Sequence, residues 1–260
     1  MTFQVRVDAQ NPGQFFGCCG LLELAQRLTG EAVGHFDGTS FHVAADCTLS
    51  QLIDRLSCTS IVQTDSDDDT GSPLRLGAPF DMLVDWWHDA WAGGRELKVW
   101  AGTMQSVRIA QAMVASLRDP EFHGESLFDI GRVVYDPGEP TKKVEPYYFD
   151  ARRAPNAHSR DVGFSPNDLE LTTTAFPAVE ALCLFGLQRC RPKPSPAGRR
   201  FFEYVWWSHP SRSSVLAPIV SGAVPLPGTR RYRFENWFRT GQRKHKAFRP
   251  AVVVRERKGS

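Results

Sequence analysis

Hydrophobic residues recur at helical spacing in four stretches of the chain, and signals for helix ends accompany them. The spacing predicts helices over residues 12–29, 49–57, 104–117 and 177–190. Asn11 and Pro12 supply a cap and a first-turn proline for the first helix, and Gly30 ends it. A capping box formed by Thr48 and Gln51 begins the second helix. The last helix is apolar on most sides, so we expect it to be buried.

Alternating hydrophobic and polar residues predict strands between these helices. The strands cover residues 2–8, 35–43 (a strand or a tight hairpin), 96–102, 130–136, 199–208, 230–239 and 251–257. Aspartate, glycine and proline mark a loop over residues 65–73. This order predicts an α+β fold in which helices pack on mixed β-sheets. A proline-rich basic connection predicts two lobes, an α+β lobe of residues 1–190 and a basic β-rich lobe of residues 191–260.

Tryptophans and cysteines are expected in the core. The tryptophans assigned to packing are Trp86, Trp87, Trp91, Trp206 and Trp207. Six cysteines without regular spacing predict reduced thiols rather than a disulfide framework. Cys18 and Cys19 are adjacent, but neighbouring helical side chains diverge by about 100° and no CxxC pattern accompanies them. Burial is therefore favoured over a metal site.

The composition is that of an ordinary globular protein. The chain has 260 residues, of which 42% are hydrophobic and 23% charged. No apolar run approaches the roughly 20 residues that span a bilayer. The N-terminus lacks the basic start and apolar centre of a signal peptide. We therefore expect a cytoplasmic protein.

Charge is unevenly distributed along the chain, although the net charge is only +2. Residues 1–90 carry four arginines and 13 acidic residues, a net of −9, and residues 91–188 carry a net of −3. Residues 189–260 carry 17 basic and three acidic residues, a net of +14. Attraction of nucleic acid is therefore expected from the C-terminal part of the chain.

The segment Arg230–Arg249 alternates cations with aromatic rings and contains a single acidic residue. Read as a strand, it places on one face Arg231, Arg233, Glu235, Trp237 and Arg239, and on the other Tyr232, Phe234 and Phe238. Thr240 and Gly241 predict a turn into a second basic arm. Cations that release counterions and rings that stack on bases are typical of RNA and single-strand binding. A solvated hairpin with core aromatics is the alternative, and the segment alone leaves both open.

Motifs of common enzymes are absent from the sequence. It contains no GxxxxGK[ST] phosphate loop, no GxGxxG that opens a helix, no HExxH and no GxSxG. His88 with Asp89, and His158 with Asp161, offer the ligand types of a metal-dependent nuclease, but isolated residues at such spacings occur by chance. We expect no enzyme, no cofactor and no metal, with a nuclease as the less favoured alternative.

Seven segments, in order over nearly the whole chain, carry a resemblance to a known family. They are NPGQFFGCCGLLELAQRL, DWWHDAW, LKVWAGTMQSVRIAQAM, YYFDARRAP with VGFSPNDLE, AFPAVEALCLFGLQRCRP, YVWWSHP and RYRFENWF. Together they resemble the short large-subunit (Cas-eight-type) family of type I-U, also named type I-G, CRISPR Cascade complexes. The resemblance lies in the succession of these segments, because each consists largely of core and turn residues.

This resemblance implies a non-catalytic subunit of an RNA-guided complex of antiviral defence, placed near the 5′ end of the guide RNA (crRNA). Such subunits recognise the short motif that flanks the target (the PAM) and help to open the target double-stranded DNA. They also contact the backbone and guide-end subunits of Cascade and dock a separate helicase-nuclease. Cations, polar side chains and aromatic rings are the groups this work requires. The alternative is a structural subunit or assembly scaffold of a ribonucleoprotein that coats RNA without reading it.

Candidate nucleic-acid contacts are the cations, and one amide, that lie in or beside the resembling segments or in the basic hairpin. They are Lys98, Gln105, Arg108, Lys142, Lys143, Arg152, Arg153, Arg230, Arg231, Arg233, Arg239, Arg243, Lys244 and Lys246. Buried salt bridges are the competing role for some of them. We expect the hairpin to grip a nucleic-acid backbone rather than read bases, because it contains no defined base-reading motif.

Overall fold

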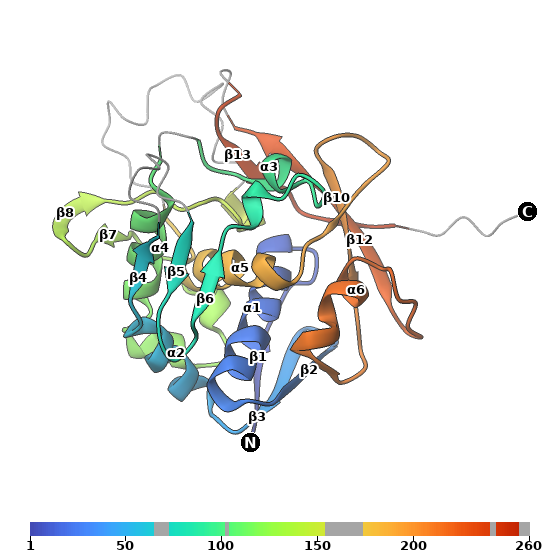
Figure 1. The fold of residues 1–260 in the computed structure, drawn as a ribbon, viewed down its shortest axis with the longest axis horizontal. Helices are drawn as coiled ribbons and strands as arrows, with labels where there is room; N and C mark the ends of the chain where they lie inside the picture. Colours follow the sequence, from blue (N-terminus) through green and yellow to red (C-terminus); the bar gives the residue numbers. More distant parts are fainter. Residues whose placement is uncertain (65–72, 102–103, 154–173, 240–242, 255–260) are drawn as a thin grey trace, which may run out of the picture.

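The computed structural model describes residues 1–64, 73–101, 104–153, 174–239 and 243–254. The fold is α+β, as predicted, and combines helices with several antiparallel sheets. Two long helices, α1 (Pro12–Thr29) and α5 (Pro177–Arg189), lie side by side at the centre of the molecule, with sheets around them (Figure 1).

The α1 and α5 helices approach each other closely enough for their backbones to touch. A Cβ added to Gly186 of α5 would lie 1.9 Å from the carbonyl oxygen of Phe16 in α1, so only glycine fits there. The ends of α1 are as predicted: the Asn11 side chain accepts a hydrogen bond from the backbone N–H of Gly13, and Gly30 caps the C-terminus with φ at 82°. Most residues of both helices are buried, which explains why their sequences are apolar on nearly every side.

The first sheet has four antiparallel strands in the order β1-β3-β2-β11. These strands are β1 (Thr2–Arg6), β2 (Ala32–Asp37), β3 (Ser40–Ala45) and β11 (Ser211–Arg212). The hairpin expected over residues 35–43 is present as β2 and β3. The predicted capping box begins α2 (Leu49–Ser57), which follows this sheet.

The second sheet carries the basic hairpin. Its strands run in the order β13-β12-β10-β9, and β14 also pairs with β12. They are β9 (Lys193–Pro194), β10 (Phe201–Trp206), β12 (Arg230–Phe238), β13 (Lys246–Phe248) and β14 (Val252–Val253). Phe15 of α1 packs on Tyr204 of β10 with ring centroids 4.2 Å apart. The buried core therefore continues across the boundary expected at residues 190 and 191.

Smaller elements cover the remaining side of the helices. The strands are β4 (Ile61–Gln63), β5 (Leu74–Leu76) and β6 (Met82–Val84) in one sheet, and β7 (Tyr135–Asp136) with β8 (Glu139–Lys143) in a hairpin. The other α-helices are α3 (Gly94–Leu97), α4 (Ser106–Ser116) and α6 (Leu216–Val220). Short 3-10 helices cover Trp86–His88, Pro120–His123, Leu127–Asp129, Ala151–Arg153 and Ser213–Val215. Within the described residues, no helix combines the length and apolarity needed to cross a membrane.

Two predictions in the segment after β6 are wrong. The strand expected over residues 96–102 is absent from its described part. Glu96 and Leu97 belong to α3, which begins after Gly93 in a left-handed conformation, and residues 98–101 form no strand. Trp91, expected in the core, is 98% exposed, whereas Trp86 and Trp87 are buried as predicted.

Other boundaries differ in detail. The strand expected over residues 130–136 shortens to β7, and α4 begins at Ser106 with Gln105 as its N-cap. The cap predicted at Thr103, and the loop predicted over residues 65–73 apart from its last residue, lie outside the described residues.

Candidate nucleic-acid interface

The β12–β13 hairpin has the alternating burial that its sequence predicts. Tyr232 and Phe234 are buried, while Arg231 and Arg233 lie half-buried on the opposite face. β12 pairs with β10 along one edge and with β13 along the other. The turn predicted at residues 240 and 241 lies outside the described residues.

Glu203 of β10 neutralises the two arginines at the centre of the hairpin. It lies directly opposite Arg233, whose Nε and Nη2 are 2.9 Å and 2.8 Å from its Oε1. The Nη1 of Arg231 is 3.5 Å from Oε2, and the Ser195 hydroxyl donates to Oε1 at 2.7 Å. Burial acts to raise the pKa of Glu203, but the hydrogen bonds from Ser195 and Arg233 outweigh it and lower that pKa. These arginines therefore already have a carboxylate partner.

Arg239, expected on the outward face, is buried. Its guanidinium stacks 3.4 Å from the ring centroid of Tyr148, and its Nη2 lies 3.1 Å from Nδ1 of His245. Burial, then the neighbouring Arg239 charge, lowers the pKa of His245 below its ordinary value. The alternation ends here because β12 itself ends at Phe238, and the Arg239 N–H donates to the His245 carbonyl. Arg239 thus holds the turn end of the hairpin against Tyr148.

Lys246 is also committed to structure. Its Nζ lies 3.7 Å from the Glu96 carboxylate and donates to the backbone carbonyls of Arg95 and Glu96. Burial is the largest cause of the lowering of its pKa. This cation joins β13 to α3.

Three of the candidate hairpin cations are exposed and unpaired within the described residues, whereas exposed Arg249 pairs with Glu235. Arg230, Arg243 and Lys244 form no ion pair with any residue that the structure describes. The Arg230 guanidinium lies 5.3 Å from the ring centroid of Trp206. These three residues, not the centre of the hairpin, are the groups that the hairpin offers to an anion.

Four other candidate residues, from two separate segments, line one groove of about 430 Å³. Gln105 and Arg108 come from the start of α4, while Lys142 and Lys143 come from the end of β8. Arg108 Nη1 lies 4.0 Å from Asp136 and 3.8 Å from Glu139, and Lys142 also lies within 3.5 Å of Glu139. Half of the Arg108 side chain remains exposed, so these pairs lie at the surface and bind their cations weakly.

The start of α4 adds a favourable dipole to this groove. Gln105 is the N-cap but its side chain makes no capping hydrogen bond, and the first turn contains no acidic residue. The first N–H groups of a helix lack intrahelical partners and carry partial positive charge. They increase the attraction of the groove for an anionic group.

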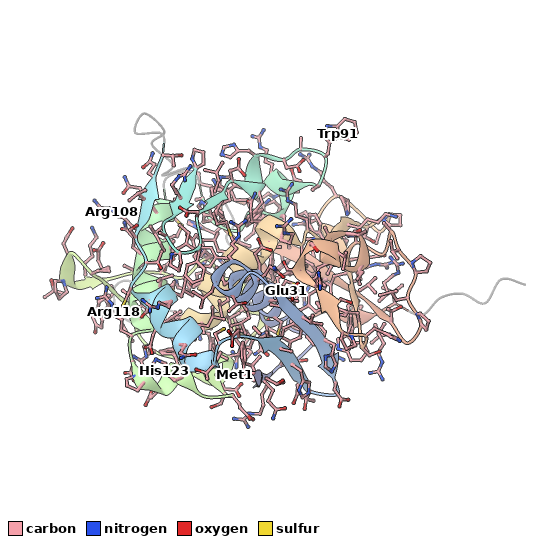
Figure 2. All side chains as sticks on the ribbon, turned by 60° about the horizontal axis from the view of Figure 1, so that its bottom comes forward. Met1, Glu31, Trp91, Arg108, Arg118 and His123 are labelled. Carbon is pink, nitrogen blue, oxygen red and sulfur yellow. The ribbon has the colours of Figure 1, made fainter. Side chains whose placement is uncertain are left out.

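A second hollow, of about 610 Å³, continues along the same face of α4. It shares Arg108 and Asp136 with the first and adds Gln111 and Arg118. Figure 2 shows Arg108 and Arg118 on the same side of the molecule. We call the two hollows together the α4 groove, and its defining side chains are Gln105, Arg108, Gln111, Arg118, Lys142 and Lys143.

Arg118 is absent from the candidates that the sequence suggests. Its signal was nonetheless present, because Arg108 and Gln111 lie off the apolar stripe of α4 and Arg118, just after the end of α4, continues their helical spacing. A search for polar periodicity, in addition to apolar periodicity, would have found it.

Arg152 has a structural role. Its Nη2 lies 2.7 Å from the buried carboxylate of Asp150 and donates to the Phe128 carbonyl, while its guanidinium lies 3.5 Å from the ring centroid of Phe176. The following Arg153 is half-buried, and its Nε has no hydrogen-bond partner among the described residues. Lys98 Nζ lies 4.9 Å from the ring centroid of Trp100.

Of the two suggested nuclease pairs, the structure describes His88 and Asp89, and it brings no further metal ligands to them among the described residues. Among those residues, no group of three or more histidine, cysteine or acidic side chains is placed to hold a metal ion. Asp89 is paired with Arg191, and His158 and Asp161 lie outside the described residues. Cys18 and Cys19 are buried, and burial raises the pKa of each thiol well above its ordinary value.

Comparisons with protein-family models, curated proteins and solved structures found no match. Interpretation of the site therefore rests on its own geometry. The α4 groove offers cations, two amides and a helix N-terminus on one face, and the hairpin offers three exposed cations beside a sheet. This arrangement suits the binding of an extended anion better than covalent chemistry.

Proposed function

We propose that this chain is a non-catalytic large subunit of a CRISPR Cascade surveillance complex, which contacts nucleic acid through the α4 groove. The ordered resemblance of seven sequence segments motivates the family. The observation that carries the binding role is the convergence of Gln105 and Arg108 with Lys142 and Lys143, from segments more than 30 residues apart, in one groove. Cations and amides in a groove at a helix N-terminus are suited to phosphate contacts.

The dimensions of the α4 groove support contact with several phosphates. Arg108 lies near the start of α4, Arg118 lies two residues after its last residue, Ser116, and both line the groove. The helical part from Arg108 to Ser116 spans about 12 Å along the helix axis, which is the length of roughly three to four nucleotides of one strand of a duplex. Asp136 and Glu139 limit the net positive charge, so the α4 groove favours backbone contact at defined positions over diffuse attraction.

Within this proposal, the partners are those of the resembling family. They are the crRNA, the target double-stranded DNA with its PAM, the neighbouring Cascade subunits and the helicase-nuclease, all in the cytoplasm. The acidic first third of the chain is suited to contact basic protein surfaces, because it would repel nucleic acid.

The test is co-purification of the tagged full chain from its native cells, followed by extraction and sequencing of bound RNA. We expect a uniform, short guide RNA together with other Cascade subunits. Recovery of the chain without RNA, or with heterogeneous cellular RNA, contradicts the assignment.

A scaffold that coats RNA without reading it is the second candidate. The neutralisation of Arg231 and Arg233 by Glu203 favours it, because the hairpin centre has few groups left for base recognition. Competition between target duplexes that differ only in the flanking motif separates the two candidates. A preference supports the large subunit, and equal competition supports the scaffold.

A further inference from the structure

Trp91 is the most exposed large hydrophobic side chain among the described residues. It is 98% exposed and projects from the molecule, as Figure 2 shows. Trp86 and Trp87 pack against Trp100 in the core, so this tryptophan is separated from the cluster to which its sequence neighbours belong. A fully exposed indole leaves a large apolar surface in water, and such surfaces commonly mark binding sites.

The turn that carries Trp91 is braced by its neighbours. Asp89 Oδ1 accepts hydrogen bonds from the backbone N–H groups of Trp91 and Ala92, at 3.0 Å and 3.3 Å. The other carboxylate oxygen pairs with Arg191, and the Asp89 carbonyl accepts from the Gly94 N–H at 2.7 Å. The backbone that presents Trp91 is thereby fixed, which lowers the entropy lost when a ligand binds.

Gly93 fixes this turn against the second sheet. It has φ at 66°, and a Cβ there would lie 3.1 Å from the Phe202 ring and 3.5 Å from Pro194. The Trp91 turn therefore packs beside β9, which contains Lys193 and Pro194.

Cations lie in the segments that pack next to the Trp91 turn. Arg191 is bonded to the same carboxylate that receives the Trp91 N–H, and exposed Arg95 lies in α3, four residues after Trp91. Lys193 is exposed on β9, and neither Arg95 nor Lys193 forms an ion pair with the described residues. The nearby carboxylates are already engaged, Asp89 by Arg191 and Glu96 by Arg199 and Lys246.

We propose that Trp91 is a stacking platform for an unpaired base of single-stranded nucleic acid, whose adjacent phosphates contact Arg95 and Lys193. An exposed ring on a turn whose neighbouring segments carry cations matches a base and its phosphates, because bases stack on aromatic faces regardless of sequence. A protein partner that anchored on this tryptophan would have to bury the surrounding cations, which makes it the less suited occupant. The site rests on the proposed function only in taking nucleic acid as its ligand, and it lies on elements that do not line the α4 groove.

The experiment is a titration of the full chain with a short fluorescein-labelled oligothymidylate, followed by anisotropy at low salt. We expect Trp91→Ala to weaken binding about tenfold, while Trp91→Phe keeps most of the affinity, because removal of one stacked base typically has this effect. Leu83→Ala is the matched control, since Leu83 is also an exposed apolar residue, and it should leave binding unchanged.

Two further measurements separate stacking from charge. An abasic oligonucleotide should bind the wild-type chain as weakly as oligothymidylate binds Trp91→Ala. The wild type and Trp91→Ala should bind the abasic oligonucleotide with equal affinity. Lys193→Gln should reduce the slope of the logarithm of affinity against the logarithm of salt concentration by about 0.7, which Trp91→Ala should not change.

Three outcomes overturn the stacking site: no binding of the oligonucleotide by the wild type, equal binding by wild type and Trp91→Ala, or loss of a co-purifying protein as the only effect of Trp91→Ala. These outcomes are distinct from failure of the Cascade assignment. If no guide RNA co-purifies but Trp91→Ala binds the oligonucleotide tenfold more weakly, the stacking site is retained and the Cascade assignment is rejected. If guide RNA co-purifies but Trp91→Ala binds the oligonucleotide as well as the wild type does, only the stacking site is rejected.

Discussion

The hairpin centre and the α4 groove are both basic in sequence, but only one presents its charge to solvent. In the hairpin, the Arg233 side chain is 31% exposed and that of Lys246 is 13% exposed, and each has a carboxylate partner. In the α4 groove, the side chains of Arg108 and Lys142 are 50% and 51% exposed. A high density of cations along a chain is therefore not equivalent to an available cationic surface.

The cause is the geometry of the two elements. A strand places its side chains within about 5 Å of those directly opposite on the next strand, so one acidic residue on β10 reaches two arginines of β12. On the outer face of α4, Arg108 also has acidic neighbours, but they lie 3.8 Å to 4.0 Å away at the surface and leave half of its side chain exposed. Three carboxylates, Glu203, Glu235 and Glu96, are enough to pair with four cations of this strongly positive segment, which are Arg231, Arg233, Arg249 and Lys246.

The largest predicted effect is a loss of stability when the carboxylate at the hairpin centre is removed. Glu203→Gln should leave Arg231 and Arg233 half-buried without a counter-charge and lower the free energy of unfolding by about 2–3 kcal/mol. Urea denaturation at neutral pH measures this loss. Because the pKa of Glu203 is lowered in the fold, the stability that the ionised carboxylate contributes is present above its ordinary value of 4.5 and is lost as pH falls.

The exposed Glu125→Gln is the control for Glu203→Gln, and it should change stability by less than about 0.5 kcal/mol. Stability of Glu203→Gln equal to that of the wild type would show that the arginines are not held by this carboxylate.

A smaller effect on stability concerns residues 144–150, the segment that runs from the α4 groove to the β12–β13 hairpin. This segment follows β8, and the Tyr148 carbonyl accepts from the N–H of Phe248 in β13. Glu180 of α5 holds this segment in place, because its carboxyl oxygens accept hydrogen bonds from the backbone N–H groups of Phe149 and Asp150 at 3.2 Å each. Burial, the largest cause, raises the pKa of Glu180 to about 8.

The pH dependence follows from the direction of that shift. As pH rises from 4.5 towards about 8, the unfolded chain loses the Glu180 proton and the folded chain keeps it, so stability falls. Between pH 6 and pH 8 we expect the free energy of unfolding to fall by on the order of 2 kcal/mol. Glu180→Gln should flatten this decline in urea titrations at the two pH values, and an unchanged decline would assign it to other groups.

The smallest expected effect on stability comes from removing cations of the α4 groove, which should instead change the salt dependence of duplex binding. Arg108→Gln with Arg118→Gln should reduce the slope of the logarithm of duplex affinity against the logarithm of salt concentration by about 1.8, with little change in stability. Arg231→Gln with Arg233→Gln should lower stability and leave this slope nearly unchanged. Arg55→Gln, an exposed cation of α2 outside the α4 groove, is the control and should change neither. Equal salt slopes for both double variants would remove the distinction between the two regions.

Much of the fold could be predicted from local signals. The bounds of α2, the caps of α1 and the strand character of β12 all depend on residues within a few positions of each other. The strand predicted at residues 96–102 is wrong because α3 takes up its start. The residues after α3 contact β13, where the Val99 carbonyl accepts from the Lys246 N–H at 2.8 Å. That contact crosses almost 150 residues of sequence, so no local pattern reveals it.

The candidate site follows the same division between local and distant contacts. The sequence by itself determined which residues are charged, which face of each element they occupy and where the main helices begin and end, because spacing and caps act over a few residues. Only the tertiary structure decided which cations are available. Glu203 meets Arg233 through a cross-strand register, Arg191 pairs with Asp89 at the Trp91 turn, and α4 meets β8 in a shared groove. Each of these contacts depends on segments that folding brings together.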